Sequence, residues 1–174
     1  MKKTLILNLV VALCFVMAGL AWAGEAKDDV ALHKSCKYCG MDRGAYAFSR
    51  MLIEYDDGTL IGFCSMRCAI VDLANNIDKA PRLIQVGDFN GRQLIDAEQA
   101  FWVVGGSKPG VMSRRGKWAF AKKEEAEGFL KTNQGKIVSF EEAMKMAHED
   151  LYEDTRAIRE RRKMKRLKMM EQKK

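Results

Sequence analysis

The sequence is poor in histidine and lacks the signatures of common enzyme classes. Its two histidines, His33 and His148, are too few for a typical histidine-ligated catalytic metal centre. No Ser/His/Asp arrangement or dinucleotide-binding glycine pattern occurs, and Gly105-Gly106-Ser107 is not followed by the Gly-Lys-Ser/Thr ending of a phosphate-binding loop. These absences predict a protein that is not an enzyme.

Long apolar runs are also scarce. The run at residues 5–20 follows two lysines and is shorter than the roughly 20 residues that a membrane-spanning helix needs. Ala21-Trp22-Ala23 after it fits a small-x-small cleavage site, so we predict a cleaved signal peptide over residues 1–23 and export to the periplasm. An uncleaved membrane anchor is one alternative. A lipoprotein modified on Cys14 is another, although a bulky leucine precedes that cysteine.

Basic charge is concentrated at the C-terminal end. Residues 155–174 contain ten Lys/Arg and two acidic residues, whereas residues 24–154 contain 18 basic and 21 acidic side chains. The high isoelectric point therefore belongs to a tail, and we predict no nucleic-acid partner. The tail is either a solvated helix or an element that contacts a membrane or an acidic partner electrostatically.

Alternating apolar residues and turn signals predict two β-β-α-β units. In the first unit, Asp57-Gly58 joins two strands, Ser65 caps a helix that ends before Pro81, and a third strand follows. Its strands are expected at residues 45–55, 59–64 and 82–86. The second unit is expected to use an apolar segment at 94–104, strands at 117–121 and 136–139, and a helix at 122–132.

These units predict the fold class and the domain boundaries. The class is α+β, with two β-β-α-β lobes forming one compact domain, followed by a basic C-terminal helix. We expect a metal-binding domain over residues 24–148 and a basic helical tail over residues 149–174.

The sharpest motif is Cys36-Lys37-Tyr38-Cys39-Gly40-Met41. Two thiolates three positions apart on a turn can converge on one ion, Gly40 lets the backbone bend, and Met41 places a thioether nearby. Thiolate and thioether are soft ligands that select copper(I) over magnesium, calcium or manganese. A C-x-x-C pair alone equally describes a redox dithiol or half of a zinc knuckle.

A second cluster, Cys64-Ser65-Met66-Arg67-Cys68, lies at the predicted junction of strand and helix. The i to i+4 spacing places both thiols on one face if the helix begins there. The hairpin returns Cys64 toward the chain just after Cys39, so four sulfurs can meet. A four-cysteine zinc site, two disulfides, and a copper(I) site that includes Met41 and Met66 remain open at this point.

An ordered series of motifs resembles the NosL family, the accessory proteins of nitrous oxide reductase maturation. The resemblance covers roughly residues 33–145. Its stretches are the Cys36–Met41 motif, Phe63-Cys64-Ser65, Leu94-Ile95-Asp96-Ala97 to Trp102-Val103-Val104-Gly105, Gly110-Val111-Met112, and Phe120 through Gly135-Lys136-Ile137-Val138-Ser139-Phe140-Glu141-Glu142.

The resemblance implies a two-lobed fold and a periplasmic copper(I) metallochaperone in denitrification. Such a protein passes copper toward a copper enzyme, such as nitrous oxide reductase, or toward its membrane assembly machinery. By residue match, Met112 takes the position of a thioether ligand, while Cys68 is an additional thiol. Typical members are lipoproteins and often end in His- and Met-rich tails, unlike this chain.

We therefore predict a copper(I)-binding accessory protein, with zinc as the alternative metal. The candidate ligands are Cys36, Cys39, Met41, Cys64, Met66, Cys68 and Met112. Two rival functions are a thiol-disulfide carrier using the C-x-x-C pair and a zinc-stapled interaction domain.

Overall fold

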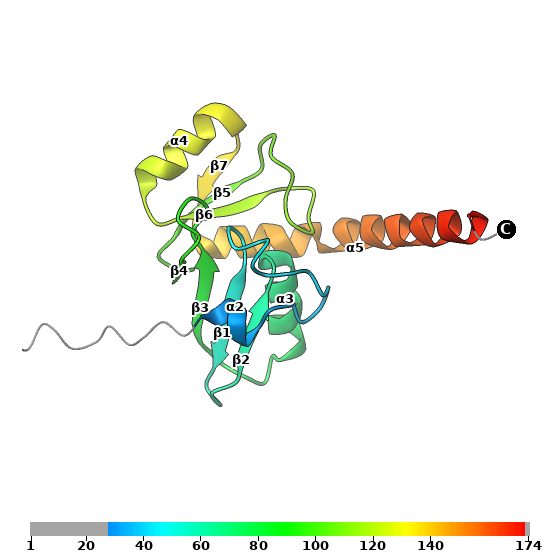
Figure 1. The fold of residues 1–174 in the computed structure, drawn as a ribbon. Helices are drawn as coiled ribbons and strands as arrows, with labels where there is room; N and C mark the ends of the chain where they lie inside the picture. The colour runs from blue at the N-terminus through cyan, green and yellow to red at the C-terminus, as the bar shows by residue number, and fades with distance from the viewer. Residues whose placement is uncertain (1–27, 173–174) are drawn as a thin grey trace, which may run out of the picture.

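The computed structural model describes residues 28–172 and contains two antiparallel sheets, three helices longer than one turn, and a short N-terminal helix (Figure 1). The predicted signal peptide over residues 1–23 lies outside the described residues. The short helix, α2, spans Asp29–Leu32 and is capped by the Asp28 carboxylate, which accepts a hydrogen bond from the Val30 backbone N–H at 3.0 Å.

The first lobe is built on a four-stranded sheet in the order β2-β1-β3-β4. Its strands are β1 (Met51–Tyr55), β2 (Leu60–Phe63), β3 (Pro81–Gly87) and β4 (Leu94–Asp96), and α3 (Met66–Asn75) connects β2 to β3. The β1–β2 hairpin closes at the predicted Asp57-Gly58 turn, where Gly58 has a φ of 80° that favours glycine. This hairpin carries the chain from β1 back toward the segment that precedes it.

The second lobe repeats the arrangement with shorter strands. Its sheet has the order β6-β5-β7, and every pair is antiparallel. The strands are β5 (Phe101–Val104), β6 (Lys117–Phe120) and β7 (Lys136–Val138), and α4 (Lys123–Asn133) connects β6 to β7. In both lobes the first strand of the hairpin is paired with the strand that follows the helix, so each lobe is a β-β-α-β unit.

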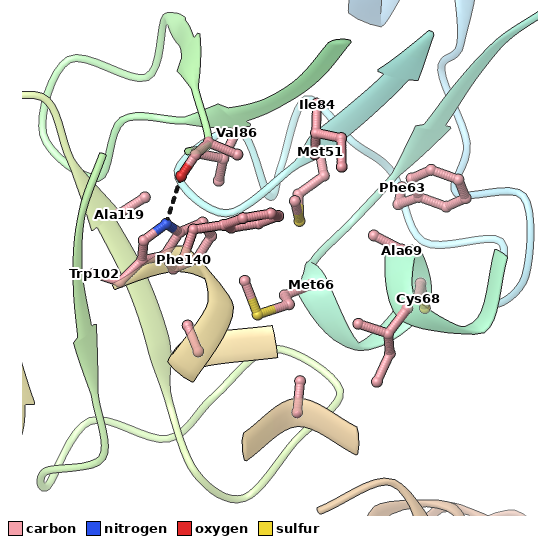
Figure 2. Packing of buried hydrophobic residues seen from close by; sticks show 14 of the residues in the cluster. Met51, Phe63, Met66, Cys68, Ala69, Ile84, Val86, Trp102, Ala119 and Phe140 are labelled. Carbon is pink, nitrogen blue, oxygen red and sulfur yellow. Dashed lines mark hydrogen bonds between the residues drawn. The ribbon is translucent and has the colours of Figure 1, made fainter. Parts of the chain in front are cut away.

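One core joins the two lobes (Figure 2). Along β5, Trp102 and Val104 face this shared core, whereas Val103 faces a smaller cluster beneath α4. The alternation follows from the two-residue period of a strand. The Trp102 indole N–H donates to the Ala97 carbonyl at 2.8 Å, so a polar atom buried at the lobe boundary is satisfied.

The long helix α5 (Phe140–Glu171) binds the lobes together and then leaves them (Figure 1). It begins with a capping box between Ser139 and Glu142, and it contacts both α3 and β5. Ile158 is the last buried apolar residue of α5, and the helix beyond it is exposed. No helix among residues 28–172 has the length and apolar character needed to cross a membrane.

The α+β class, the two lobes and the C-terminal helix are confirmed, and two local predictions are wrong. Residues 45–49 form turns rather than the start of a strand, because the Asp42 carboxylate accepts a hydrogen bond from the Ala45 N–H at 2.9 Å and bends the chain. The helix that was expected to continue until Pro81 ends at Asn75, and Ile77 beyond it is 90% exposed.

Candidate metal site

The C-x-x-C motif forms a tight loop ahead of β1. The Cys36 N–H donates to the Met41 carbonyl at 2.9 Å, and the Gly40 N–H donates to the Cys36 carbonyl at 2.9 Å. Gly40 has a φ of 74°, and no atom lies within 4 Å of the position a Cβ would occupy. The positive φ therefore favours glycine at position 40, as the sequence predicted, although neighbouring atoms would leave room for a Cβ.

The second cysteine pair lies where β2 passes into α3. Cys64 follows the last residue of β2, Ser65 precedes the helix, and Cys68 is the third residue of α3. The Ser49 hydroxyl donates to the Cys64 carbonyl at 2.9 Å, and the Cys68 N–H donates to the Ser65 carbonyl at 3.1 Å. Although Cys64 lies before the helix, these contacts bring its sulfur within 3.9 Å of the Cys68 sulfur.

The structure brings together the sulfurs of the four cysteines among the described residues. The four Sγ atoms of Cys36, Cys39, Cys64 and Cys68 lie within 4.8 Å of one another, and those of Cys39 and Cys64 are 3.4 Å apart. Sulfurs each 2.3 Å from one ion at tetrahedral angles lie roughly 3.8 Å apart. All four thiols are free, so the disulfide alternative does not describe this structure.

Access to this four-thiol cluster is one-sided. Cys36, Cys64 and Cys68 are buried, whereas Cys39 is half-buried. A ligand from another molecule can therefore approach the cluster at Cys39, while the remaining sulfurs stay shielded from solvent.

The four thiols differ in their affinity for protons. Hydrogen bonds from Cys39, Cys64 and Cys68 hold the pKa of Cys36 far below its usual range. At Cys39 the contact with Cys36 raises the pKa, but contacts with Cys64 and Cys68 prevail and lower it to about 7. Contact with Cys36, together with burial, raises the pKa values of Cys64 and Cys68. A cation beside the cluster would therefore favour further deprotonation, because it offsets the added negative charge.

Two of the three predicted thioether ligands lie near each other and pack against the core that contains the cysteines. Met41 and Met112 both pack against the cluster of buried residues that contains Cys36, Cys64 and Cys68. They also line one hollow of about 320 Å³ between the C-x-x-C segment and the β5–β6 connection. Met112 has a φ of 59°, a left-handed conformation uncommon for a residue with a side chain. The structure thus groups Met41 with Met112 next to the thiol-bearing core.

The third predicted thioether is not brought to the thiols. Figure 2 shows Met66 pointing toward Trp102 and Phe140 in the shared core, with Cys68 on the opposite side of α3. Residues two positions apart on a helix are separated by about 200° around its axis. Met66 is 3% exposed, and its surroundings make it a core residue.

A buried ionic frame, which the sequence motifs did not predict, lies behind the C-x-x-C loop. Arg43 is fully buried, and its guanidinium donates to the Asp29 carboxylate at 2.6 Å. Arg50 donates to the same carboxylate at 2.8 Å. The other acceptors of Arg43 are the carbonyls of Asp29, His33, Met51 and Phe63. The only sequence signal is an Asp-Arg-Gly stretch after the motif, which resembles an ordinary exposed turn.

The fold and the cluster define a class: an α+β protein with two β-β-α-β lobes and a sulfur-rich site suited to a soft metal ion. The NosL family model matches residues 28–147. The chain belongs to the NosL family. This membership confirms the resemblance seen in the sequence and the prediction that the chain is not an enzyme.

Comparison with solved structures gives the same fold. The chain is similar to the crystal structure of the copper chaperone NosL from Shewanella denitrificans, with a TM-score of 0.50 and 24% sequence identity. The similarity covers 62% of this chain and 87% of the other chain. No curated protein matches the sequence.

Proposed function

We propose that the protein is an exported copper(I) carrier. It binds copper(I) through thiolates of the four-thiol cluster and delivers the ion for maturation of a periplasmic copper enzyme such as nitrous oxide reductase. The observation that carries the proposal is the convergence of four free cysteine sulfurs within 4.8 Å, three of them buried. Membership in the NosL family and the name of the similar copper chaperone support the choice of metal.

The ligand chemistry favours a soft ion. Thiolate sulfur is polarisable and prefers copper(I) or zinc(II) to magnesium, calcium or manganese. The hollow lined by Met41 and Met112 adds thioethers, which suit copper(I). A structural zinc site, in contrast, has four protein ligands, and thioethers beside it would not bind the metal. The proposed cargo is therefore copper(I), and zinc(II) is its competitor.

Transfer by ligand exchange fits the one-sided access. A partner that offers a thiolate or an imidazole approaches Cys39, which is half-buried. The incoming ligand bonds to copper as a sulfur of the carrier leaves, so the ion changes its ligands without oxidation or reduction. The buried Cys36, Cys64 and Cys68 keep the ion from solvent until the partner is engaged. The recipient in this proposal is a copper enzyme or its membrane assembly machinery.

The end of α5 is proposed to help the carrier find its partner. Arg159, Arg162, Lys163 and Arg166 recur at helical spacing on the exposed part of this helix. Such a row of cations attracts an anionic membrane surface or an acidic protein, and the attraction weakens as salt rises. This contact is separate from metal binding, because the four cysteines lie in the first lobe.

Metal analysis of protein isolated anaerobically from the periplasm tests the proposal against its rivals. A copper carrier contains copper with reduced cysteines, and the chain begins near Gly24. A zinc-stapled domain contains zinc at about one ion per chain. A thiol-disulfide carrier contains neither metal and has a reversible Cys36–Cys39 disulfide. Either of the last two results would overturn the copper proposal.

A further inference from the structure

Both residues between the first two cysteines are attached to one buried carboxylate. Asp72 lies on α3, one turn beyond Cys68, and is fully buried. The Tyr38 hydroxyl donates to Asp72 Oδ1 at 2.8 Å, and the Lys37 Nζ lies 3.2 Å from the same oxygen. The C-x-x-C loop is thereby tied by its side chains to the helix that carries Cys68.

We propose that Asp72 is a positioning residue that clamps the C-x-x-C loop onto α3 and so holds the first cysteine pair beside the second. The clamp consists of Asp72 and Tyr38, assisted by Lys37. It rests on the proposed function, because it sets how firmly the carrier retains copper. Release of Tyr38 from Asp72 frees the loop and lets the metal leave.

The buried carboxylate also has a fixed partner on the core side. Asp72 Oδ2 accepts a hydrogen bond from the Tyr55 hydroxyl at 2.6 Å, and Tyr55 lies on β1 with no exposed surface. A buried carboxylate is costly unless it is hydrogen-bonded, so Tyr55 satisfies the oxygen that Tyr38 and Lys37 do not, while the backbone of α3 fixes the position of Asp72. Tyr38 is 36% exposed. The network thus has an inner half, Tyr55 and Asp72, that is buried in the core. Its outer half, Tyr38, lies at the surface and can separate from Asp72.

The clamp also reaches the strand that leads to Cys64. The Tyr38 ring stacks on Phe63, with ring centroids 6.2 Å apart and planes 15° from parallel, and Phe63 directly precedes Cys64. The Lys37 N–H donates to the Gly62 carbonyl at 3.2 Å. The loop of the first cysteine pair therefore contacts both elements that carry the second pair, and Tyr38 contributes to both attachments.

The expected consequence is preorganisation of the four sulfurs. The backbone of the loop is held by one isolated bridge between Ser35 and Asp42, by turn hydrogen bonds and by the Lys37 bond to Gly62. Without the clamp, binding a metal must also order the loop, which weakens affinity. Outer groups that orient metal ligands typically change affinity by about 10–100-fold when they are removed.

Two tyrosine variants separate this role from general stability. Tyr38→Phe and Tyr55→Phe each remove one hydroxyl from Asp72 and keep the ring, but only Tyr38 lies in the C-x-x-C loop. We expect Tyr38→Phe to lower copper(I) affinity about tenfold and to speed transfer to a chelator. Tyr55→Phe should lower the thermal midpoint of the metal-free protein and leave affinity within about twofold of wild type.

A readout without metal distinguishes failure of the clamp from failure of the proposed function. Amide hydrogen exchange in the metal-free protein should become faster at Lys37 and Gly40 in Tyr38→Phe and stay unchanged there in Tyr55→Phe. If wild type binds no copper, the proposed function is wrong, while the exchange rates still test the clamp. Equal exchange in both variants, or unchanged copper affinity in Tyr38→Phe alongside a copper-binding wild type, would overturn the clamp.

Discussion

Replacing Arg43 with methionine should destabilise the metal-free protein far more than an exposed arginine replacement does. The Arg43 guanidinium makes five hydrogen bonds, and an arginine has five side-chain N–H donors, so its donor capacity is fully used. Methionine has similar length and an apolar stem but no donor. The substitution removes the hydrogen bonds that Arg43 donates to four backbone carbonyls and removes one of the two cations beside Asp29.

The magnitude follows from burial. Breaking a buried ion pair by removing one partner typically costs about 3–5 kcal/mol. For a protein of this size, each kcal/mol lowers the thermal midpoint by roughly 2–4 °C, so Arg43→Met should lower it by about 6–20 °C. Arg82→Met is the matched control, because the Arg82 side chain is 65% exposed and pairs with Glu54 at the surface. That change should cost no more than about 0.5 kcal/mol.

The assay is thermal and urea unfolding of both variants without metal, since a bound ion stabilises the folded state and obscures the comparison. Equal unfolding midpoints for Arg43→Met and Arg82→Met, or a loss below about 1 kcal/mol for Arg43→Met, would show that the frame behind the loop is not a stabilising element. The reasoning from buried hydrogen bonds would then be wrong.

Three further predictions concern the thioethers, acid stability and the tail. Met112→Leu should weaken copper(I) binding in a chelator competition. Met66→Leu should leave the copper(I) affinity unchanged, because Met66 faces the core. A larger loss of affinity in Met66→Leu than in Met112→Leu would contradict the placement of these side chains. Burial raises the pKa of Asp29, but hydrogen bonds and attraction from Arg50 and Arg43 prevail and lower it. Asp29→Asn should therefore lower the thermal midpoint at pH 7, with the difference from wild type shrinking below about pH 4; a constant difference would refute this. Truncation after residue 160 removes eight Lys/Arg and one Glu. It should leave copper binding and the thermal midpoint unchanged and reduce co-sedimentation with anionic vesicles at low salt, and a large drop in the midpoint would show that the end of α5 stabilises the domain.

Local sequence signals predicted the paired elements, because each lobe depends on short-range features. The Asp57-Gly58 turn fixed the first hairpin, and helical periodicity marked α3 and α4. The apolar segment 94–104 was harder to interpret, since it divides into β4 of one sheet and β5 of the other. Which sheet each half joins depends on pairing with residues far away in the chain, which the segment itself does not encode.

Hairpin geometry and residue chemistry were sufficient to predict that the cysteines come together, but not to place every side chain of the site. Cys64 was expected to return toward Cys39, and their sulfurs lie 3.4 Å apart. Met66 was included because it adjoins the second cluster in sequence, but the helical period places it on the opposite side from Cys68. Asp72 is one carboxylate within an otherwise apolar stretch of α3. Its partners Tyr38 and Tyr55 come from other parts of the chain, so its role appears only in the folded structure.

The central claim is that the four-thiol cluster is a copper(I) site, and anaerobic competition with a copper(I) chelator tests it most directly. Reduced wild type should bind about one copper(I) per chain in preference to zinc(II). The Cys36→Ser/Cys39→Ser variant should lose most of this affinity, because a hydroxyl lacks the charge and polarisability of a thiolate. Equal copper(I) affinity in wild type and the double variant would contradict the account.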